Sequence, residues 1–327
     1  MAQTMSATNR VDVGRFPDRS RREANTEIPR AGGRISVGSA DDERPQRAPD
    51  GTQAGSLSGT ANVSCAALAT ARRRPAKMRV LFVTEDDPLY VIQFFNVFFD
   101  IYSRDKIEIC GLTIGRPFHE PLRKTLRRML GFYGPWGTFR QGLRFVSAKL
   151  RARSIESLAV AADVPLVAAR SVNQPDYLDQ VRTIAPDMIV SVAAPEVFKA
   201  QLLGLPPLGC INIHSGRLPA YRGMMPTFWQ MLRGERAITI TVHYMAEKLD
   251  AGDVLATQSF AIRQSDSLDR VIRETKREAA RLVVGVLRDL REGKAAARPP
   301  AMERSEYFSF PKREDVRAFR QRGHRLL

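Results

Sequence analysis

Cysteine and histidine are scarce in this sequence of 327 residues, which contains three cysteines and four histidines. Cys65, Cys110 and Cys210 are odd in number and far apart. This spacing supports neither a disulfide framework nor a zinc site, and it is typical of proteins in a reducing cytoplasm. No run approaches about 18 uncharged apolar residues, which excludes a transmembrane helix. We therefore expect a cytoplasmic protein that binds no metal.

Acidic residues are outnumbered by basic ones, with 35 Asp and Glu against 51 Lys and Arg, so that the formal net charge is +16. A nucleic acid, an anionic membrane surface or an anionic substrate would each suit such a charge. The simpler interpretation is that arginines occupy solvated faces, because net charge bears on solubility and encounter rather than on chemistry.

Residues 1–77 differ in composition from everything that follows. The segment is rich in Ala, Ser, Thr, Gly and Arg and has no sustained hydrophobic periodicity. It cannot bury enough apolar surface to offset the entropy of ordering, so we expect a disordered tail. It lacks the apolar core of a secretory signal, and its eight acidic residues argue against an organellar transit peptide. Met78 is then a candidate initiator.

From residue 78 onward, short apolar strand patterns alternate with helix patterns. Strands are predicted at 79–84, 107–113, 165–168, 187–192, 210–213, 238–244 and 255–262. Helices are predicted at 89–102, 155–162, 174–184, 196–203, 226–233 and 267–291. This alternation indicates an α/β fold, with a Rossmann-like, mostly parallel sheet and helices on both faces. We expect one domain at 78–300, followed by a short C-terminal extension at 301–327.

The motifs of two large nucleotide-binding classes are missing. No GxGxxG follows the first predicted strand, and no GxxxxGK[ST] occurs anywhere. These absences disfavour a dinucleotide-dependent dehydrogenase and a P-loop NTPase. Ligands of parallel sheets bind outside the carboxyl ends of the strands. We therefore expect the chemistry in the loops after Val192 and after Ile213.

One stretch, residues 210–253, combines side chains suited to acyl transfer. Asn212 and His214 lie two positions apart on a predicted strand, so their side chains point to the same face. An amide N–H beside an imidazole can polarise a carbonyl and hold the oxyanion that forms on attack. A later acidic loop carries Asp250, whose carboxylate could reach this pocket and take a proton. Taken singly, such a histidine is more often a structural residue, so the inference depends on the combined pattern.

The same stretch closely resembles the formyltransferases that use 10-formyltetrahydrofolate, a family that includes methionyl-tRNA, glycinamide ribonucleotide and sugar-amine N-formyltransferases. The family's Asn-x-His and its Leu-Pro-x-Tyr-Arg-Gly-type loop correspond to residues 212–214 and 218–223. Its later Asp-x-Gly and the strand histidine before it correspond to residues 250–252 and to His243. The resemblance follows the strand order over residues 78–300, and its specific motifs lie within 210–255.

This resemblance implies direct transfer of a formyl group from 10-formyltetrahydrofolate to a primary amine of a small molecule, such as an amino sugar or a nucleotide-linked amino sugar. Asn212 and His214 would stabilise the oxyanion, Asp250 would handle the proton, and no metal would be needed. In the family, the pterin lies against the backbone near the end of the preceding strand and near the acidic loop. The corresponding positions here are Val192, Ala193, Ala194, Pro195, Ala246, Glu247 and Leu249.

The loop after His214 departs from the family, which commonly has Pro-Ser where this chain has Ser215-Gly216. Gly216 is expected to add backbone freedom and to reshape the substrate side without removing a catalytic atom. Tyr221 and Arg222 either contact the substrate or brace the loop against the helix at 226–233. Arg217 is a candidate for an anionic group of the substrate. We assign structural roles to His243 and Asp253.

A basic helical insert is predicted at 119–153. Between Pro121 and Ile155 there are nine Lys and Arg residues and no acidic residue, with apolar residues interleaved. Two basic amphipathic helices broken at Gly134-Pro135 fit this pattern. Such helices can lie on anionic membranes or attract a phosphate-bearing substrate. A helical hairpin that covers the sheet, or an oligomer interface, is the simpler interpretation.

The segment after Gly293 bears on the identity of the acceptor. It is too short for the additional tRNA-binding barrel that methionyl-tRNA formyltransferases carry after the catalytic domain. We therefore expect a small-molecule amine and no nucleic acid as partner. One alternative is an enzyme similar to methionyl-tRNA formyltransferase. The other, from a different class, is a non-catalytic adaptor that uses the basic insert at 121–153 to bind a membrane or a nucleic acid.

Overall fold

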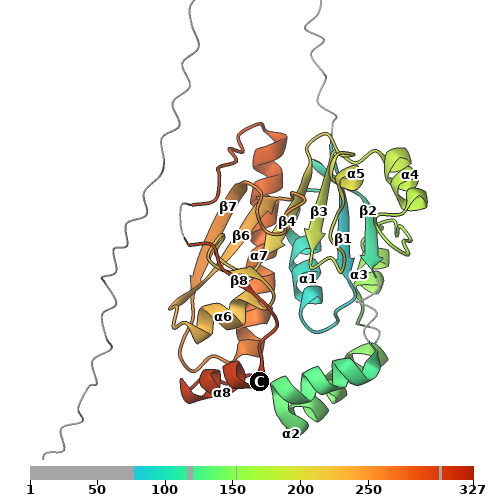
Figure 1. Cartoon of the computed structure of the whole chain (residues 1–327). Coiled ribbons are helices and arrows are strands. Elements are labelled where there is room, and N and C mark those ends of the chain that lie inside the picture. Colours follow the sequence, from blue (N-terminus) through green and yellow to red (C-terminus); the bar gives the residue numbers. More distant parts are fainter. Residues whose placement is uncertain (1–76, 116–120, 152, 302–303) are drawn as a thin grey trace, which may run out of the picture. The chain divides into compact units, whose positions relative to one another are not determined.

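A central sheet of six strands organises the protein (Figure 1). The structure is a computed structural model, and it describes residues 77–115, 121–151, 153–301 and 304–327. The tail predicted at 1–77 thus lies outside the described residues, apart from Lys77. The strands of this sheet, in spatial order, are β2 (Ile107–Gly115), β1 (Met78–Glu85), β3 (Met188–Val192), β4 (Cys210–His214), β6 (Ala237–Tyr244) and β7 (Val254–Ala261).

The sheet is parallel over its first four strands and antiparallel over the last two. β1 pairs in parallel with β2 and β3, and β3 pairs in parallel with β4. β6 then runs antiparallel to both β4 and β7. All five residues of β3 are buried, as expected for a parallel strand covered on both faces. The prediction of an α/β, mostly parallel sheet is confirmed.

Helices cover both faces of the sheet. One face packs against α1 (Val91–Ile101), α3 (Ile155–Ala161) and α7 (Leu268–Arg291), whose buried side chains share one core with the strands. The other face packs against α4 (Pro175–Ile184) and α5 (Ala200–Leu203) through a second cluster that includes Tyr177 and Leu202. Side chains alternate along β4, so Ile211 and Ile213 belong to the first core, and Asn212 and His214 point to the opposite face.

The C-terminal segment is part of the main body and not an appendage. A third apolar cluster joins α6 (Pro226–Leu232) to α8 (Arg313–Gln321) and includes Phe132, Phe228 and Phe319. The short strands β5 (Arg222–Gly223) and β8 (Tyr307–Phe308) pair in parallel. The segment predicted as a C-terminal extension therefore holds the loop that follows β4.

The described part of the predicted insert forms α2 (Leu122–Leu150), which is interrupted at Gly134. Gly134 has φ 76°, a left-handed conformation that favours glycine, and Pro135 follows it. α2 is anchored on the body by Gln141 Nε2, which donates to the Tyr90 hydroxyl over 2.8 Å. The break at Gly134-Pro135 agrees with the sequence, but α2 contacts α8 and the amino ends of α1 and α7 instead of covering the sheet.

Two local predictions were wrong. Residues 165–168 do not form a strand, because only Leu166 makes an isolated bridge, to Leu112. The helix predicted at 196–203 is restricted to its last four residues. None of the helices among the described residues is both long and apolar enough to cross a membrane.

Candidate active site

β4 and β6 bring two polar pairs together on one face of the sheet. In their antiparallel register Asn212 lies opposite His243, and His214 lies opposite Thr241. His214, Thr241 and His243 are buried, and Asn212 is half-buried. Four polar side chains therefore converge at the carboxyl end of β4, where parallel sheets bind ligands.

Asn212 is oriented by His243. Burial, and secondarily the neighbouring His214, lowers the pKa of His243 from 6.5 to about 4, so its ring is neutral at pH 7. Its Nδ1–H donates to the carbonyl oxygen of Tyr244 over 2.8 Å, which leaves Nε2 as an acceptor. Nε2 lies 3.3 Å from Asn212 Nδ2. An acceptor at this position requires the amide nitrogen, and not the amide oxygen, to face it. The second N–H of the same amide can then donate to a ligand oxygen.

His214 lies between two acceptors. Its Nε2 donates to the carbonyl oxygen of Tyr221 over 2.5 Å. Its Nδ1 lies 3.7 Å from Asp250 Oδ1, which is an ion-pair distance and too long for a direct hydrogen bond. The bond to Tyr221 fixes the ring plane, so Nδ1 is the nitrogen that can face a ligand.

Asp250 reaches the cluster from the loop after β6. Its Oδ1 lies 3.7 Å from His214 Nδ1 and 3.8 Å from His243 Nε2, and its Oδ2 accepts from the backbone N–H of Gly223 over 2.9 Å. Asp250 has φ 51°, a left-handed conformation that is unfavourable for a non-glycine residue. The loop also requires Gly252, where a Cβ would lie 2.0 Å from the Tyr244 carbonyl oxygen. The backbone is thus strained at Asp250 itself, the residue that carries the carboxylate.

The loop after β4 is tightly packed, which changes the interpretation of Gly216. A Cβ at this position would lie 2.6 Å from Pro226 Cβ and 2.9 Å from His214 Nε2. The carbonyl oxygen of Gly216 accepts a hydrogen bond of 2.8 Å from the buried Thr241 hydroxyl. Glycine at 216 is therefore explained by the lack of room for a Cβ between Pro226 and the ring of His214. The expected added backbone freedom stays a prediction.

The three residues predicted to contact substrate are engaged within the protein. Tyr221 is only 2% exposed, and its hydroxyl donates to Glu235 Oε1 over 2.7 Å. Arg217 pairs with the same carboxylate, with Nη2 3.3 Å from Oε1. Arg222 donates to the carbonyl oxygen of Leu249, so it ties the loop after β4 to the loop that carries Asp250. These contacts favour the bracing alternative for Tyr221 and Arg222. The Tyr221 side chain is held by Glu235, by Phe308 and by Arg233 at the end of the helix predicted at 226–233.

The two segments predicted to hold a pterin lie at the ends of β3 and β6. Ala193 and Ala194 are half-buried small residues directly after β3, and Ala193 has φ 55°. Val192 and Pro195 are buried, and the Val192 carbonyl oxygen accepts from the Thr84 hydroxyl. On the other side, Ala246, Glu247 and Leu249 are exposed. The role of these two segments in holding a pterin stays a prediction.

Sequence reasoning missed the role of His243, which it assigned to structure alone. His243 contacts Asn212 directly and lies 3.8 Å from Asp250. Its role follows from the register of β4 against β6, which places His243 opposite Asn212 and which only the structure shows. Asp253 makes no such contribution: it is exposed, and only its backbone oxygen is used, as acceptor for Tyr244.

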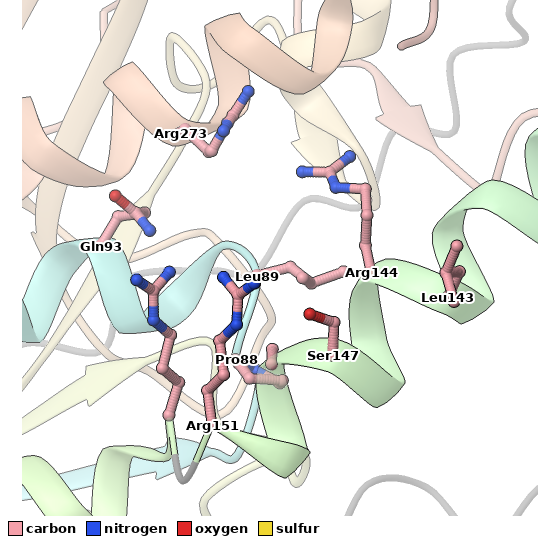
Figure 2. A pocket seen from close by; sticks show the side chains of 10 residues that line it. Pro88, Leu89, Gln93, Leu143, Arg144, Ser147, Arg151 and Arg273 are labelled. Carbon is pink, nitrogen blue, oxygen red and sulfur yellow. The ribbon is translucent and has the colours of Figure 1, made fainter.

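A separate pocket of about 410 Å³ lies away from these residues (Figure 2). It is lined by α1, α2 and α7, and α1 and α7 cover the sheet face opposite to Asn212 and His214. Arginines from α2, from the segment after it and from α7 line this pocket. It is therefore distinct from the candidate active site.

Comparison with known proteins shows a family likeness over the segment that carries these residues. Residues 144–287, which include Asn212, His214, His243 and Asp250, match the sequence model of the family described as formyl transferase. This segment of the chain is therefore similar to the formyl transferase family. Within the described residues of the chain, no group of three or more His, Cys, Asp or Glu residues is arranged to hold a metal ion.

Among curated proteins, the methionyl-tRNA formyltransferase of Pelobacter propionicus is 32% identical over 166 residues, which are 51% of this chain and 52% of that protein. The methionyl-tRNA formyltransferase of Geobacillus thermodenitrificans is 33% identical, over 47% of this chain and 48% of that protein. The chain thus spans about half the length of the curated relatives it matches.

Likeness to solved structures is weaker. Glycinamide ribonucleotide transformylase 1 from Symbiobacterium toebii aligns with a TM-score of 0.48 and 13% identity, over 67% of this chain and 90% of that one. A sugar N-formyltransferase from a Shewanella species aligns with a TM-score of 0.46 and 17% identity, over 71% of this chain and 76% of that one. At these values the likeness by itself assigns neither a substrate nor a site.

Proposed function

We propose that this protein transfers a formyl group from 10-formyltetrahydrofolate to a primary amine of a small molecule, such as an amino sugar or a nucleotide-linked amino sugar. One observation carries the proposal: Asn212, His214 and Asp250, which are separated in the sequence, converge on one face at the carboxyl end of β4. The family match over residues 144–287 supports the same chemistry.

In the proposed reaction the amine nitrogen attacks the formyl carbon. A new C–N bond forms, the bond from the formyl carbon to N10 of the folate breaks, and one proton passes from the amine to N10. Formyl transfer of this kind needs no net oxidation and no further co-reactant. The demands on the protein are an oxyanion site, a proton carrier and exclusion of water.

The chain's own residues meet these demands as follows. Asn212 donates its second amide N–H to the developing oxyanion, while His243 holds the first. His214 Nδ1 faces the same space and adds a second donor when it carries a proton. Asp250, held by the N–H of Gly223, accepts the proton that leaves the amine. Removal of one oxyanion donor typically costs about 3–4 kcal/mol of transition-state stabilisation.

The folate ring would lie between the segment at 192–195 and the loop at 246–249. Ala193 and Ala194 are small and half-buried, and Ala246, Glu247 and Leu249 are exposed. Asp250 follows this loop directly, so binding of the ring and placement of the carboxylate are mechanically linked. Arg222 supports that link through its bond to the Leu249 carbonyl.

The test is a transfer assay on the full chain, with 10-formyltetrahydrofolate and a panel of amino sugars, nucleotide-linked amino sugars, amino acids and charged tRNA. We expect release of tetrahydrofolate and a formylated amine with one class of acceptor. Asn212→Ala, His214→Ala and Asp250→Asn should each lower kcat at least a hundredfold. Asp253→Asn, which changes an exposed carboxylate in the same loop, is the matched control and should retain activity. Near-normal transfer by His214→Ala would remove that residue from the mechanism.

Methionyl-tRNA is the second candidate acceptor. It is favoured by the names of the two curated relatives and by the nine basic residues between 121 and 155. Charged initiator tRNA in the panel distinguishes the two. Formylation of methionyl-tRNA, with binding that weakens steeply as salt rises, would replace the small-molecule proposal. If the chain is instead a non-catalytic adaptor, no acceptor is formylated. Its binding to a membrane or a nucleic acid is then unaffected by changes at Asn212 and His214.

A further inference from the structure

α2 carries a row of large apolar side chains that face solvent. The row, hereafter the apolar stripe, consists of Trp136 (74% exposed), Phe139 (61%), Leu143 (60%), Val146 (52%) and Leu150 (82%). Trp136 and Phe139 stack on each other, with ring centroids 5.6 Å apart. Single exposed apolar residues are common on proteins, but a contiguous row of five on one helix marks an interaction surface.

The spacing of the stripe places it on the side of α2 that faces away from the body. Its residues follow one another at intervals of three, four, three and four, which keeps them on one helix face. Gln141 and Ala148, which are buried, lie on the opposite face and anchor the helix. Gln141 bonds to the Tyr90 hydroxyl. The described part of the chain therefore leaves the stripe uncovered, while the other side of the same helix is docked.

The charge beside the stripe has one sign. Between residues 121 and 153 there are nine Lys and Arg residues and no Asp or Glu. Arg140 is exposed and lies next to the stripe, one residue after Phe139. A second copy of this helix laid against the first would bring like charges together, which is unfavourable. An anionic surface would complement them.

The pocket between α2 and the body adds further positive groups beside the stripe. Figure 2 shows the guanidinium groups of Arg144, Arg151 and Arg273 turned into the same space, and Arg153 also lines it. Arg144 and Arg273 share a single carboxylate, Asp269, at 2.8 and 2.5 Å, so positive charge remains in excess. Leu143 belongs to the stripe and also lines the pocket. The apolar and the cationic surfaces are therefore continuous.

We propose that α2 docks the protein on a lipid surface that carries anionic headgroups. The helix lies in the plane of the surface, with the apolar stripe at the boundary between headgroups and acyl chains. Arg140, which is exposed beside the stripe, faces the lipid phosphates, and the arginines of the adjacent pocket add to the positive potential of this surface. Basic helices with Trp, Phe and Leu on one face bind anionic lipid surfaces in this manner. The surface is separate from Asn212 and His214, so this proposal does not depend on the proposed catalytic function.

Flotation of the full chain with vesicles tests the proposal. We expect binding to vesicles of phosphatidylcholine with phosphatidylglycerol, and at least tenfold weaker binding to phosphatidylcholine alone. The triple variant Trp136→Ser, Phe139→Ser, Leu143→Ser should bind anionic vesicles at least tenfold more weakly, with an unchanged circular dichroism spectrum. The matched control, Val160→Ser with Val197→Ser, removes two exposed apolar side chains (64% and 52%) that lie outside α2, and it should bind as the unaltered chain does.

Fluorescence gives a second, local measurement. The chain has two tryptophans, so Trp229→Phe leaves Trp136 as the single emitter. Its emission should shift to shorter wavelength when anionic vesicles are added, because the indole leaves water. Undiminished vesicle binding by the triple variant, or no shift in emission, would overturn the proposal. So would a stable dimer that dissociates in the triple variant, or binding to RNA that requires the stripe while vesicles are ignored.

Discussion

His243 should make the protein less stable in mild acid, because it is buried in its neutral form. The pKa of His243 is lowered from 6.5 to about 4, first by burial and then by the nearby His214. Above pH 6.5 the ring is neutral in both the folded and the unfolded chain, so its contribution to stability is complete there. Below pH 6.5 the unfolded chain binds a proton that the folded chain excludes. Stability is therefore lost as the pH falls from 6.5 to about 4.

The size of this effect follows from the pKa difference. Each unit of pKa difference corresponds to about 1.4 kcal/mol. Between pH 7.5 and pH 5 the loss attributable to His243 is about 2 kcal/mol, and it reaches about 3 kcal/mol once the pH is below the folded-state pKa. His243 is 2% exposed, so solvent screening does not weaken this effect appreciably.

Other groups titrate in the same range, so a comparison of variants isolates the histidine. His243→Gln keeps an acceptor near Asn212 Nδ2 but cannot bind a proton. Urea unfolding of both chains, followed by tryptophan fluorescence at pH 7.5 and at pH 5, gives two stability differences. The unaltered chain should lose about 2 kcal/mol more than His243→Gln over this interval. Equal losses, or a larger loss in the variant, would refute the neutral, buried assignment of His243 and with it the orientation of the Asn212 amide.

Three further predictions concern stability and the site. Burial and the nearby Asp87 raise the pKa of Glu85 from 4.5 to about 7. Protonated Glu85 therefore stabilises the fold below pH 4.5, and this contribution is lost as the pH rises through 7. Glu85→Gln avoids this loss, so between pH 5 and pH 7.5 its free energy of unfolding, measured with urea, should rise by about 2–3 kcal/mol relative to that of the unaltered chain. Gly252→Ala places a Cβ against the Tyr244 carbonyl and should lower the free energy of unfolding by about 1–3 kcal/mol. It should also lower the transfer rate more than the control Gly285→Ala does, because a Cβ at Gly285 meets open space. Phe319→Ala removes a fully buried ring that stacks on Phe228, with ring centroids 4.7 Å apart. Thermal unfolding should show a loss of about 3–5 kcal/mol in the free energy of unfolding, and an unchanged melting temperature would contradict the packing of α8.

The regular part of the fold was predictable because its signals are local. β1 and β3 appear in the sequence as short continuous apolar runs, which is the pattern of strands buried on both faces. α7 combines a long apolar stripe with the cap residue Ser267, whose hydroxyl accepts from Arg270 N–H. Residues 165–168 looked like a strand from composition, but strand formation depends on a partner edge, and only Leu166 has one.

The rest could not be predicted because it depends on contacts between distant segments. β5 and β8 are two residues each and lie 85 positions apart, so neither carries a periodic pattern. The importance of His243 rests on the register between two strands, which the sequence does not specify. At Gly216 the residue type suggested backbone freedom, whereas the structure shows that Pro226 and the ring of His214 leave no room for a Cβ. In α2, periodicity indicated an amphipathic helix without indicating which of its faces the body would cover.

The pairing of β5 with β8 also has a consequence for the order in which the protein matures. The N–H of Arg222 donates to the Glu306 carbonyl, and that of Met224 to the Phe308 carbonyl. Gly223, between them, holds the carboxylate of Asp250. During translation Asn212, His214 and Asp250 leave the ribosome well before residues 306–308 do. A nascent or proteolysed chain that stops short of this region would contain every proposed catalytic side chain and still lack the strand that sets their spacing.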